Sequence, residues 1–137
     1  MTGTFSIPLR VYIEDTDAGG IVFYVNYLKF MERARTEGMR FLGFDKDHTL
    51  NQNVMFVVRS AQISYLRSAE LDDELRISFE PTAVRGAAFT VRQRVYRDDD
   101  LLADAVIECV CVSRERQKPV RLAPRIRDAL TALMQGV

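Results

Sequence analysis

The stretch IEDTDAGGIVFYVNYLKFMERAR, residues 13–35, places three carboxylates and two glycines directly before an amphipathic segment. From about Asn26 the apolar residues recur at helical spacing, and they are Tyr27, Phe30, Met31, Ala34, Gly38, Phe41 and Leu42. This period predicts a helix of about 16 residues with one apolar stripe. Asn26 is the expected N-cap, and Gly43 followed by Phe44 predicts a Schellman motif at the helix end.

Alternation of apolar and polar residues predicts strands in most of the remaining chain. In residues 5–14 one face would carry Phe5, Ile7, Leu9, Val11 and Ile13. Four meandering strands are expected within residues 55–67, 74–83, 87–96 and 101–113, and Pro124 should begin a short helix over 123–135. By this period Tyr65, Phe79 and Phe89 belong to the core.

The predicted elements follow one another as one strand, one long helix, four strands and one short helix. A run of strands favours an α+β fold with an antiparallel sheet. One helix covers only one face of a five-stranded sheet, and the other face still carries Val58, Tyr96, Val106, Val110 and Val112. We therefore expect a dimer or a higher oligomer.

Length and composition narrow the class of protein. A chain of 137 residues predicts one domain over 1–137. Lys+Arg and Asp+Glu number 19 each, which gives no net charge to attract nucleic acid or an anionic membrane. With no apolar run of roughly 20 residues and no signal-peptide pattern, we expect a cytoplasmic protein without membrane insertion. Cys109 and Cys111 are expected to be reduced core thiols, and with one histidine a zinc site is not predicted.

Several interpretations of the acidic loop remain open. A calcium loop would use Asp15, Asp17 and Gly20 at its first, third and sixth positions, but Gly19 and Asn26 then occupy positions that need ligand oxygens. A phosphotransferase loop of the haloacid dehalogenase type would need a parallel sheet, which the element order does not provide. In a purely structural interpretation, Asp15 and Asp17 only cap turns.

A further interpretation is a turn that stabilises an anion. Gly19 and Gly20 permit positive φ and a close approach of the backbone to a ligand. Residues 21–24 lead into a helix N-terminus, whose free N–H groups favour negative charge. A thioester or ester carbonyl placed there would be polarised, and Asp17 could attack it or activate a water molecule.

RVYIEDTDAGGIVFYVNYLKFMERARTEGMRFLGF, residues 10–44, resembles the signature of the 4-hydroxybenzoyl-CoA thioesterase family of acyl-CoA thioesterases. The resemblance is nearest to the branch associated with the Tol–Pal envelope system of Gram-negative bacteria. Supporting segments are FVVRSAQISYLRSAELDD, VRGAAFTVRQRV and VCVSRERQKPVRLAP. The family implies a hot-dog fold, in which an antiparallel sheet wraps the long helix, and homodimers or homotetramers with sites at subunit interfaces.

The resemblance also implies roles for single residues. Asp17 matches the catalytic carboxylate, Tyr24 the backbone N–H that polarises the carbonyl, and Gly20 the glycine that shapes the turn. Arg85 matches a basic position near the CoA nucleotide, and we add Gly86, Val58 and Arg59 to the substrate-binding set. The Tol–Pal branch often has histidine in place of Tyr24, so a histidine acid at this position is not available here.

The sequence therefore predicts hydrolysis of a short-chain or aromatic acyl-CoA without a cofactor, since coenzyme A belongs to the substrate. Glu32 on the helix is the alternative base, and His48 is expected to be a surface residue. A non-catalytic protein that binds acyl-CoA or acyl carrier protein is the alternative function. A basic C-terminal end, with Lys118, Arg121, Arg125 and Arg127, could contact CoA phosphates or an acidic carrier protein.

Overall fold

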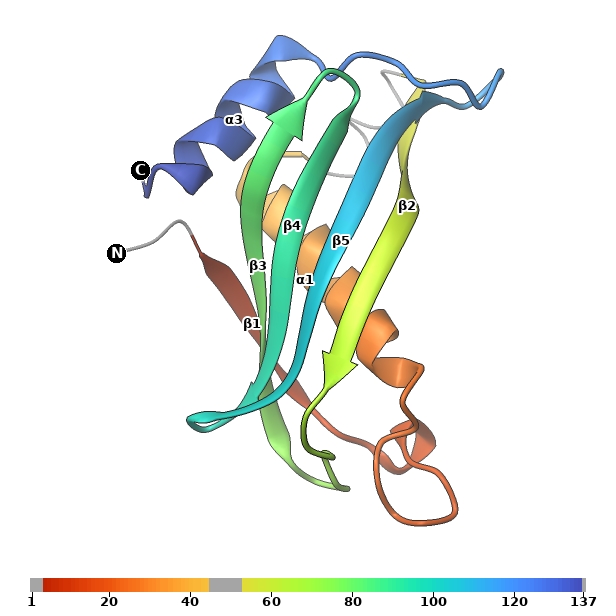
Figure 1. Cartoon of the computed structure of the whole chain (residues 1–137), viewed down its shortest axis with the longest axis vertical. Coiled ribbons are helices and arrows are strands. Elements are labelled where there is room, and N and C mark those ends of the chain that lie inside the picture. The colour runs from red at the N-terminus through yellow and green to blue at the C-terminus, as the bar shows by residue number, and fades with distance from the viewer. Residues whose placement is uncertain (1–3, 45–52, 137) are drawn as a thin grey trace.

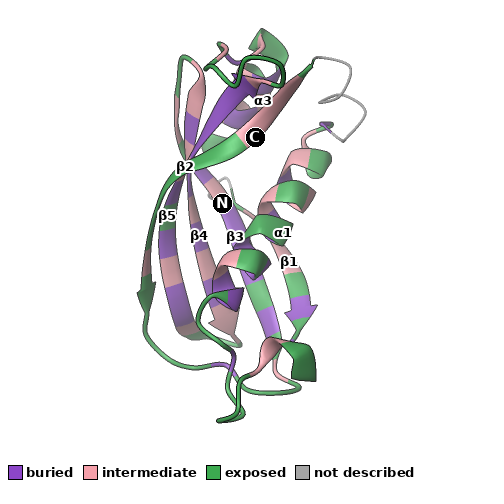
Figure 2. Cartoon of the chain, turned by 90° about the vertical axis from the view of Figure 1, so that its right-hand side faces the viewer, coloured by how far each residue is buried: buried purple, intermediate pink, exposed green. Residues whose placement is uncertain are grey.

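The computed structural model describes residues 4–44 and 53–136. The elements are β1 (Phe5–Arg10), a 3-10 turn (Ile13–Asp15), α1 (Asn26–Phe41), β2 (Val54–Tyr65), β3 (Glu74–Arg85), β4 (Ala88–Arg97), β5 (Asp100–Ser113) and α3 (Pro124–Met134). The strands form one antiparallel five-stranded sheet, and α1 crosses one of its faces (Figures 1 and 2). The predicted α+β class and the antiparallel sheet are confirmed.

The strand order is β1-β3-β4-β5-β2, which corrects the expected meander. β3, β4 and β5 are consecutive neighbours, but β2 lies beyond β5 at one edge, and β1 pairs with β3 at the other. Local alternation identifies strands but not their partners, because pairing depends on contacts between distant segments. β2 is largely exposed as a consequence of its edge position (Figure 2).

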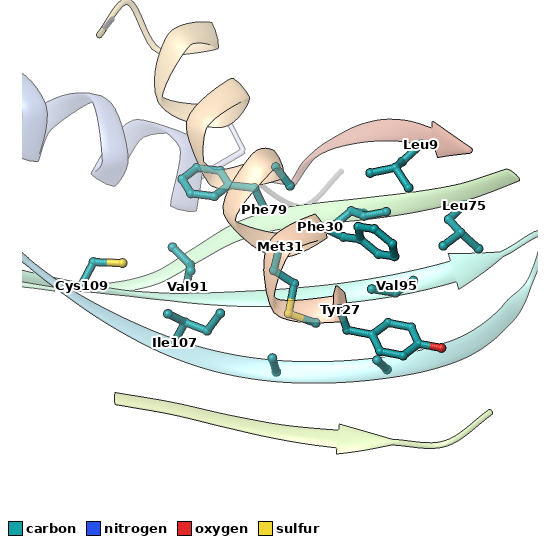
Figure 3. Packing of buried hydrophobic residues seen from close by; sticks show 14 of the residues in the cluster. Leu9, Tyr27, Phe30, Met31, Leu75, Phe79, Val91, Val95, Ile107 and Cys109 are labelled. Atoms are coloured by element: carbon teal, nitrogen blue, oxygen red, sulfur yellow. The ribbon is translucent and has the colours of Figure 1, made fainter. Parts of the chain in front are cut away.

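The core lies between α1 and the inner face of the sheet. Tyr27, Phe30 and Met31 of α1 point toward side chains of β3, β4 and β5 (Figure 3). At Gly38 the helix comes so close to the sheet that a Cβ would lie 2.5 Å from the Phe79 ring. Phe41 departs from the predicted stripe, since it is 64% exposed and stacks only on Phe5 among the rings described.

The end of α1 is a Schellman motif, as predicted. Phe44 N–H donates to the Met39 carbonyl at 2.9 Å, and Gly43 N–H donates to the Arg40 carbonyl at 2.9 Å. Gly43 has φ of +97°, which a residue without a Cβ adopts without strain.

The strand predicted over residues 5–14 ends earlier, at Arg10. Tyr12 N–H donates to the Asp15 carboxylate at 2.8 Å, and Asp15 N–H returns a bond to the Tyr12 carbonyl at 2.9 Å. These bonds close a 3-10 turn in place of further strand pairing. Ile13 is therefore 76% exposed rather than part of the buried face.

After β5 the chain turns back and pairs beside the end of that strand. Val112 pairs with Pro119, and Val120 N–H donates to the Cys111 carbonyl at 2.8 Å. Val110 and Val112 are buried within one chain, so they do not support the expected oligomer.

Both cysteines are free and buried, which confirms the prediction of unbridged core thiols. Burial raises the pKa of both thiols. The expected surface residue His48 lies outside the described residues. Within residues 4–44 and 53–136, no helix is long and apolar enough to cross a membrane.

Candidate active site

The loop before α1 is held by the backbone carbonyl of Asp15. This oxygen accepts hydrogen bonds from Phe23 N–H at 3.0 Å and from the Asn26 side-chain amide at 2.8 Å. Asn26 is buried, and it does not act as the predicted N-cap, because its side chain turns back toward the loop. The N-cap position is Val25, which has no side-chain capping bond.

Two backbone N–H groups at the start of α1 have no partner within residues 4–44 and 53–136. The N–H groups of residues 26–28 donate to carbonyls three positions earlier, at 2.8, 3.3 and 3.1 Å. Those of Tyr24 and Val25 find no acceptor among the residues that the structure describes. Unpaired donors at a helix N-terminus favour a bound anion or a polarised carbonyl.

Asp17 lies in the tight turn that precedes these donors. Its Oδ1 accepts a bond from Gly19 N–H at 2.8 Å, and its backbone carbonyl accepts one from Gly20 N–H at 3.0 Å. Of the two glycines only Gly20 takes positive φ, +81°, so the expectation for Gly19 is wrong. Gly19 instead lets the carboxylate approach, since a Cβ there would lie 3.2 Å from Asp17 Oδ1.

Asp17 and Tyr24 line the same hollow, of about 250 Å³, together with Tyr27 and Tyr65. The Tyr27 hydroxyl accepts a bond from Ala69 N–H at 2.9 Å, and the Tyr65 ring lies 5.8 Å from the Tyr24 ring. Burial raises the pKa of Tyr27 and of Tyr65, which keeps both phenols protonated near neutral pH. The hollow therefore combines one carboxylate with an aromatic wall.

The assignment of Tyr65 to the core is wrong, whereas Phe79 and Phe89 are buried as predicted. Tyr65 is 42% exposed because β2 is an edge strand. Sequence reasoning missed both Tyr27 and Tyr65 as lining residues. In the sequence, Tyr27 and Tyr65 are marked only by the apolar period. This period does not distinguish a residue of the core from a residue that lines a site.

Two more hollows follow along the space between α1 and β2. One of about 290 Å³ is lined by Val25, Leu28, Lys29, Glu32, Arg35, Val58, Ala61 and Ile107. The next, of about 630 Å³, shares Glu32, Arg35 and Val58 with it. We call the three hollows together the α1–β2 groove. Val58 lines this groove beside α1, which corrects its predicted place on the face of the sheet away from the helix. The alternative base Glu32 lies beyond the hollow that contains Asp17.

Arg59 does not join this groove. A bulge in β2 shifts the register between Val58 and Ser60, and Arg59 Nε lies 2.8 Å from Glu108 Oε1. Arg59 lines none of the described hollows.

Arg85 and Gly86 lie at the end of the sheet opposite the Asp17 loop (Figure 1). The strand register places Arg85 level with Val57 of β2, whereas the Asp17 hollow contains Tyr65. Eight residues of extended chain separate Val57 from Tyr65, which is roughly 26 Å. One chain alone therefore does not bring Arg85 to the carboxylate.

Comparison with known proteins identifies the family of this chain. Residues 19–103 match the thioesterase superfamily. The chain belongs to that superfamily. This thioesterase is 42% identical over 126 residues to the acyl-CoA thioesterase YbgC of Haemophilus influenzae, with 91% of this chain and 93% of the relative covered. It is 41% identical over 126 residues to the acyl-CoA thioester hydrolase YbgC of Escherichia coli O6:H1, with coverage of 91% and 94%.

Solved structures support the same fold. A probable thioesterase from Bartonella henselae superposes on this thioesterase with a TM-score of 0.83 and 33% identity, covering 88% of this chain and 99% of the other. A DHNA-CoA thioesterase from Staphylococcus aureus gives a TM-score of 0.89 at 18% identity, with coverage of 96% and 91%, which supports the fold alone. The predicted family, hot-dog fold and thioester hydrolase class are confirmed.

The hydrogen bond of the Asn26 amide can be tested for its role in holding the loop before α1. Asn26→Ala removes the donor to the Asp15 carbonyl, so we expect a loss of about 1–2 kcal/mol in the free energy of unfolding. We also expect a lower kcat, because the loop that carries Asp17 loses a tether. Arg33→Ala, at an exposed position of the same helix outside the described hollows, is the control and should stay within roughly 0.5 kcal/mol of wild type. Equal stability and activity in both variants would contradict this role.

Proposed function

We propose that this thioesterase hydrolyses acyl-CoA thioesters, with Asp17 and the Tyr24 backbone N–H as its catalytic groups. The observation that carries the proposal is that Asp17 lines the same hollow as Tyr24, whose backbone N–H finds no acceptor among the described residues. Hydrolysis of a thioester needs an attacking or base group and a donor for the developing oxyanion. The names of the YbgC relatives support acyl-CoA as the substrate.

In this mechanism the thioester carbonyl oxygen accepts a hydrogen bond from Tyr24 N–H. The neighbouring N–H of Val25 and the helix macrodipole add positive potential as the oxygen becomes negative. Such a donor is most effective where it is already in place and has no other partner.

Asp17 can act by either of two routes. As a base, its carboxylate takes a proton from water, whose oxygen attacks the carbonyl carbon. As a nucleophile, it attacks the carbon itself and forms an anhydride that water then cleaves. In both routes the carbon–sulfur bond breaks, the CoA sulfur leaves as a thiolate and gains a proton, and a carboxylic acid is released. The aromatic wall and modest volume of the hollow favour short-chain or aromatic acyl groups at the carbonyl.

The working form is a homodimer, or a homotetramer of two such dimers. Support comes from β2, whose outer edge pairs with no described strand, and from exposed apolar side chains beside it, which are Ile21, Phe23, Tyr24 and Val25. In such a dimer the β2 strands of two copies would pair antiparallel about a two-fold axis near Ala61. Arg85 of the second copy would then lie level with Tyr65 of the first copy. That arginine could then contact the CoA phosphates at the site of the first copy.

The carboxylate of Asp17 is tested by hydrolysis of an acyl-CoA panel, from acetyl to palmitoyl plus benzoyl. Asp17→Asn should lower kcat by roughly 10²–10⁴-fold, because the amide neither accepts a proton nor attacks. Glu32→Gln is the matched control on the groove and should retain wild-type kcat. Equal rates for Asp17→Asn and wild type would exclude this role, and binding of acyl-CoA or acyl carrier protein without hydrolysis would favour the non-catalytic alternative.

Shared sites between two copies can be tested by mixing two inactive variants. Asp17→Asn and Arg85→Ala, refolded together and assayed at low acyl-CoA concentration, should recover about a quarter of wild-type activity, since half of the dimers are mixed and each has one intact site. Asp17→Asn mixed with the Asp17→Asn/Arg85→Ala double variant should recover none. A mixture that shows only the mean of its two components would contradict the shared site.

A further inference from the structure

The far end of the α1–β2 groove contains a cation that the proposed chemistry does not use. Arg35 is half-buried on α1 and lines the two hollows beyond the one that contains Asp17. Arg35 takes part in none of the ion pairs found among the described residues. A partly buried guanidinium without an anion is unfavourable, since its charge is partly removed from water and not neutralised.

The position of Arg35 is fixed by a fully buried glutamine. Gln93 donates its side-chain amide to the carbonyls of Met31 and Ser78, at 2.9 and 3.1 Å, so the amide oxygen must face the other way. That oxygen accepts a bond from Arg35 Nη1 at 2.9 Å. Helix and sheet together therefore orient the guanidinium.

Arg35 uses only part of its hydrogen-bonding capacity on the residues that the structure describes. A guanidinium has five N–H donors in a planar fork, and the contact with Gln93 uses one of them. This fork matches the two oxygens of a carboxylate, which it binds by two parallel bonds.

The charged residues around Arg35 that the structure describes are mostly positive. Among them, Arg35, Arg40, Arg114 and the carboxylate of Glu32 line the 630 Å³ hollow, and Lys29 lines the adjoining hollow. Arg40 is paired with Glu37, whereas Glu32 and Arg114 form none of the described ion pairs. The groove thus favours an anion at its far end, even with Glu32 present.

We propose that Arg35 binds the terminal carboxylate of an acyl group that lies in the α1–β2 groove, so that the enzyme prefers ω-carboxyacyl-CoA substrates. This inference rests on the proposed function, because it takes the thioester to lie at Tyr24, but it replaces the short-chain preference proposed above with an acyl chain that continues beyond the Asp17 hollow along the groove. Arg35 is nine residues beyond Asn26, which is roughly 14 Å along the helix axis. Helical side chains lean toward the N-terminus, which shortens the span to that of a medium-length diacid.

The test compares substrates of equal carbon number: adipyl-, suberyl- and sebacyl-CoA against hexanoyl-, octanoyl- and decanoyl-CoA. Wild type should favour at least one diacid derivative by roughly tenfold to hundredfold in kcat/KM, as expected for a charge-assisted bond. Arg35→Gln keeps an N–H donor for Gln93 but removes the charge, so it should abolish the preference and leave the rates of the monoacid derivatives unchanged. Arg40→Gln, in the same hollow, is the control and should keep the preference.

No preference in wild type, or an equal fall for both substrate series in Arg35→Gln, would overturn the proposal and leave Arg35 a structural partner of Gln93. If neither series is hydrolysed, the proposed function fails, and calorimetric binding of suberyl-CoA and octanoyl-CoA decides the inference separately. Tighter binding of suberyl-CoA that Arg35→Gln removes would support it, and equal binding would overturn it.

Discussion

The backbone carbonyl of Asp15 is the acceptor on which the geometry of the site depends. It binds Phe23 N–H and the Asn26 amide together, and so it closes the acidic loop over the start of α1. With these groups and the next helical N–H groups engaged, the N–H groups of Tyr24 and Val25 are left without an acceptor in the part of the chain that the structure describes. The packing of α1 on the sheet then fixes where those donors point, and the α1–β2 groove extends from them toward Arg35.

The features of the fold that depend on local pattern could be predicted from the sequence. The period of the apolar residues located α1, and Gly43 located its Schellman end. The position of β2 could not be predicted, because an edge strand and a central strand can share the same alternation. That single unknown explains why Tyr65 was assigned to the core. The early end of β1 was missed because the Asp15 carboxylate competes for the backbone there.

For the site as well, the residues that are close in sequence could be predicted, and those that are brought together by distant contacts could not. Asp17, Gly20 and Tyr24 are close in sequence, so a contiguous motif placed Asp17 and Gly20 in one turn, and Asp17 and Tyr24 in one hollow. Arg85 and Gly86 are far along the sheet, and only an assembly of two copies would unite them with Asp17. Arg35 was missed although Gln93 gave a signal. A glutamine occupies a position where the alternation of β4 calls for an apolar residue, and a buried polar group needs partners.

The proposed mechanism requires the substrate carbonyl to bind at the Tyr24 N–H, and a crystal structure tests this position most directly. An acyl-CoA analogue in which a methylene replaces the sulfur keeps the carbonyl but cannot be hydrolysed as a thioester. We expect its carbonyl oxygen within about 2.7–3.2 Å of the Tyr24 backbone nitrogen, with the Asp17 carboxylate facing the carbonyl carbon. A carbonyl bound elsewhere, with the Tyr24 N–H still unpaired, would contradict the account.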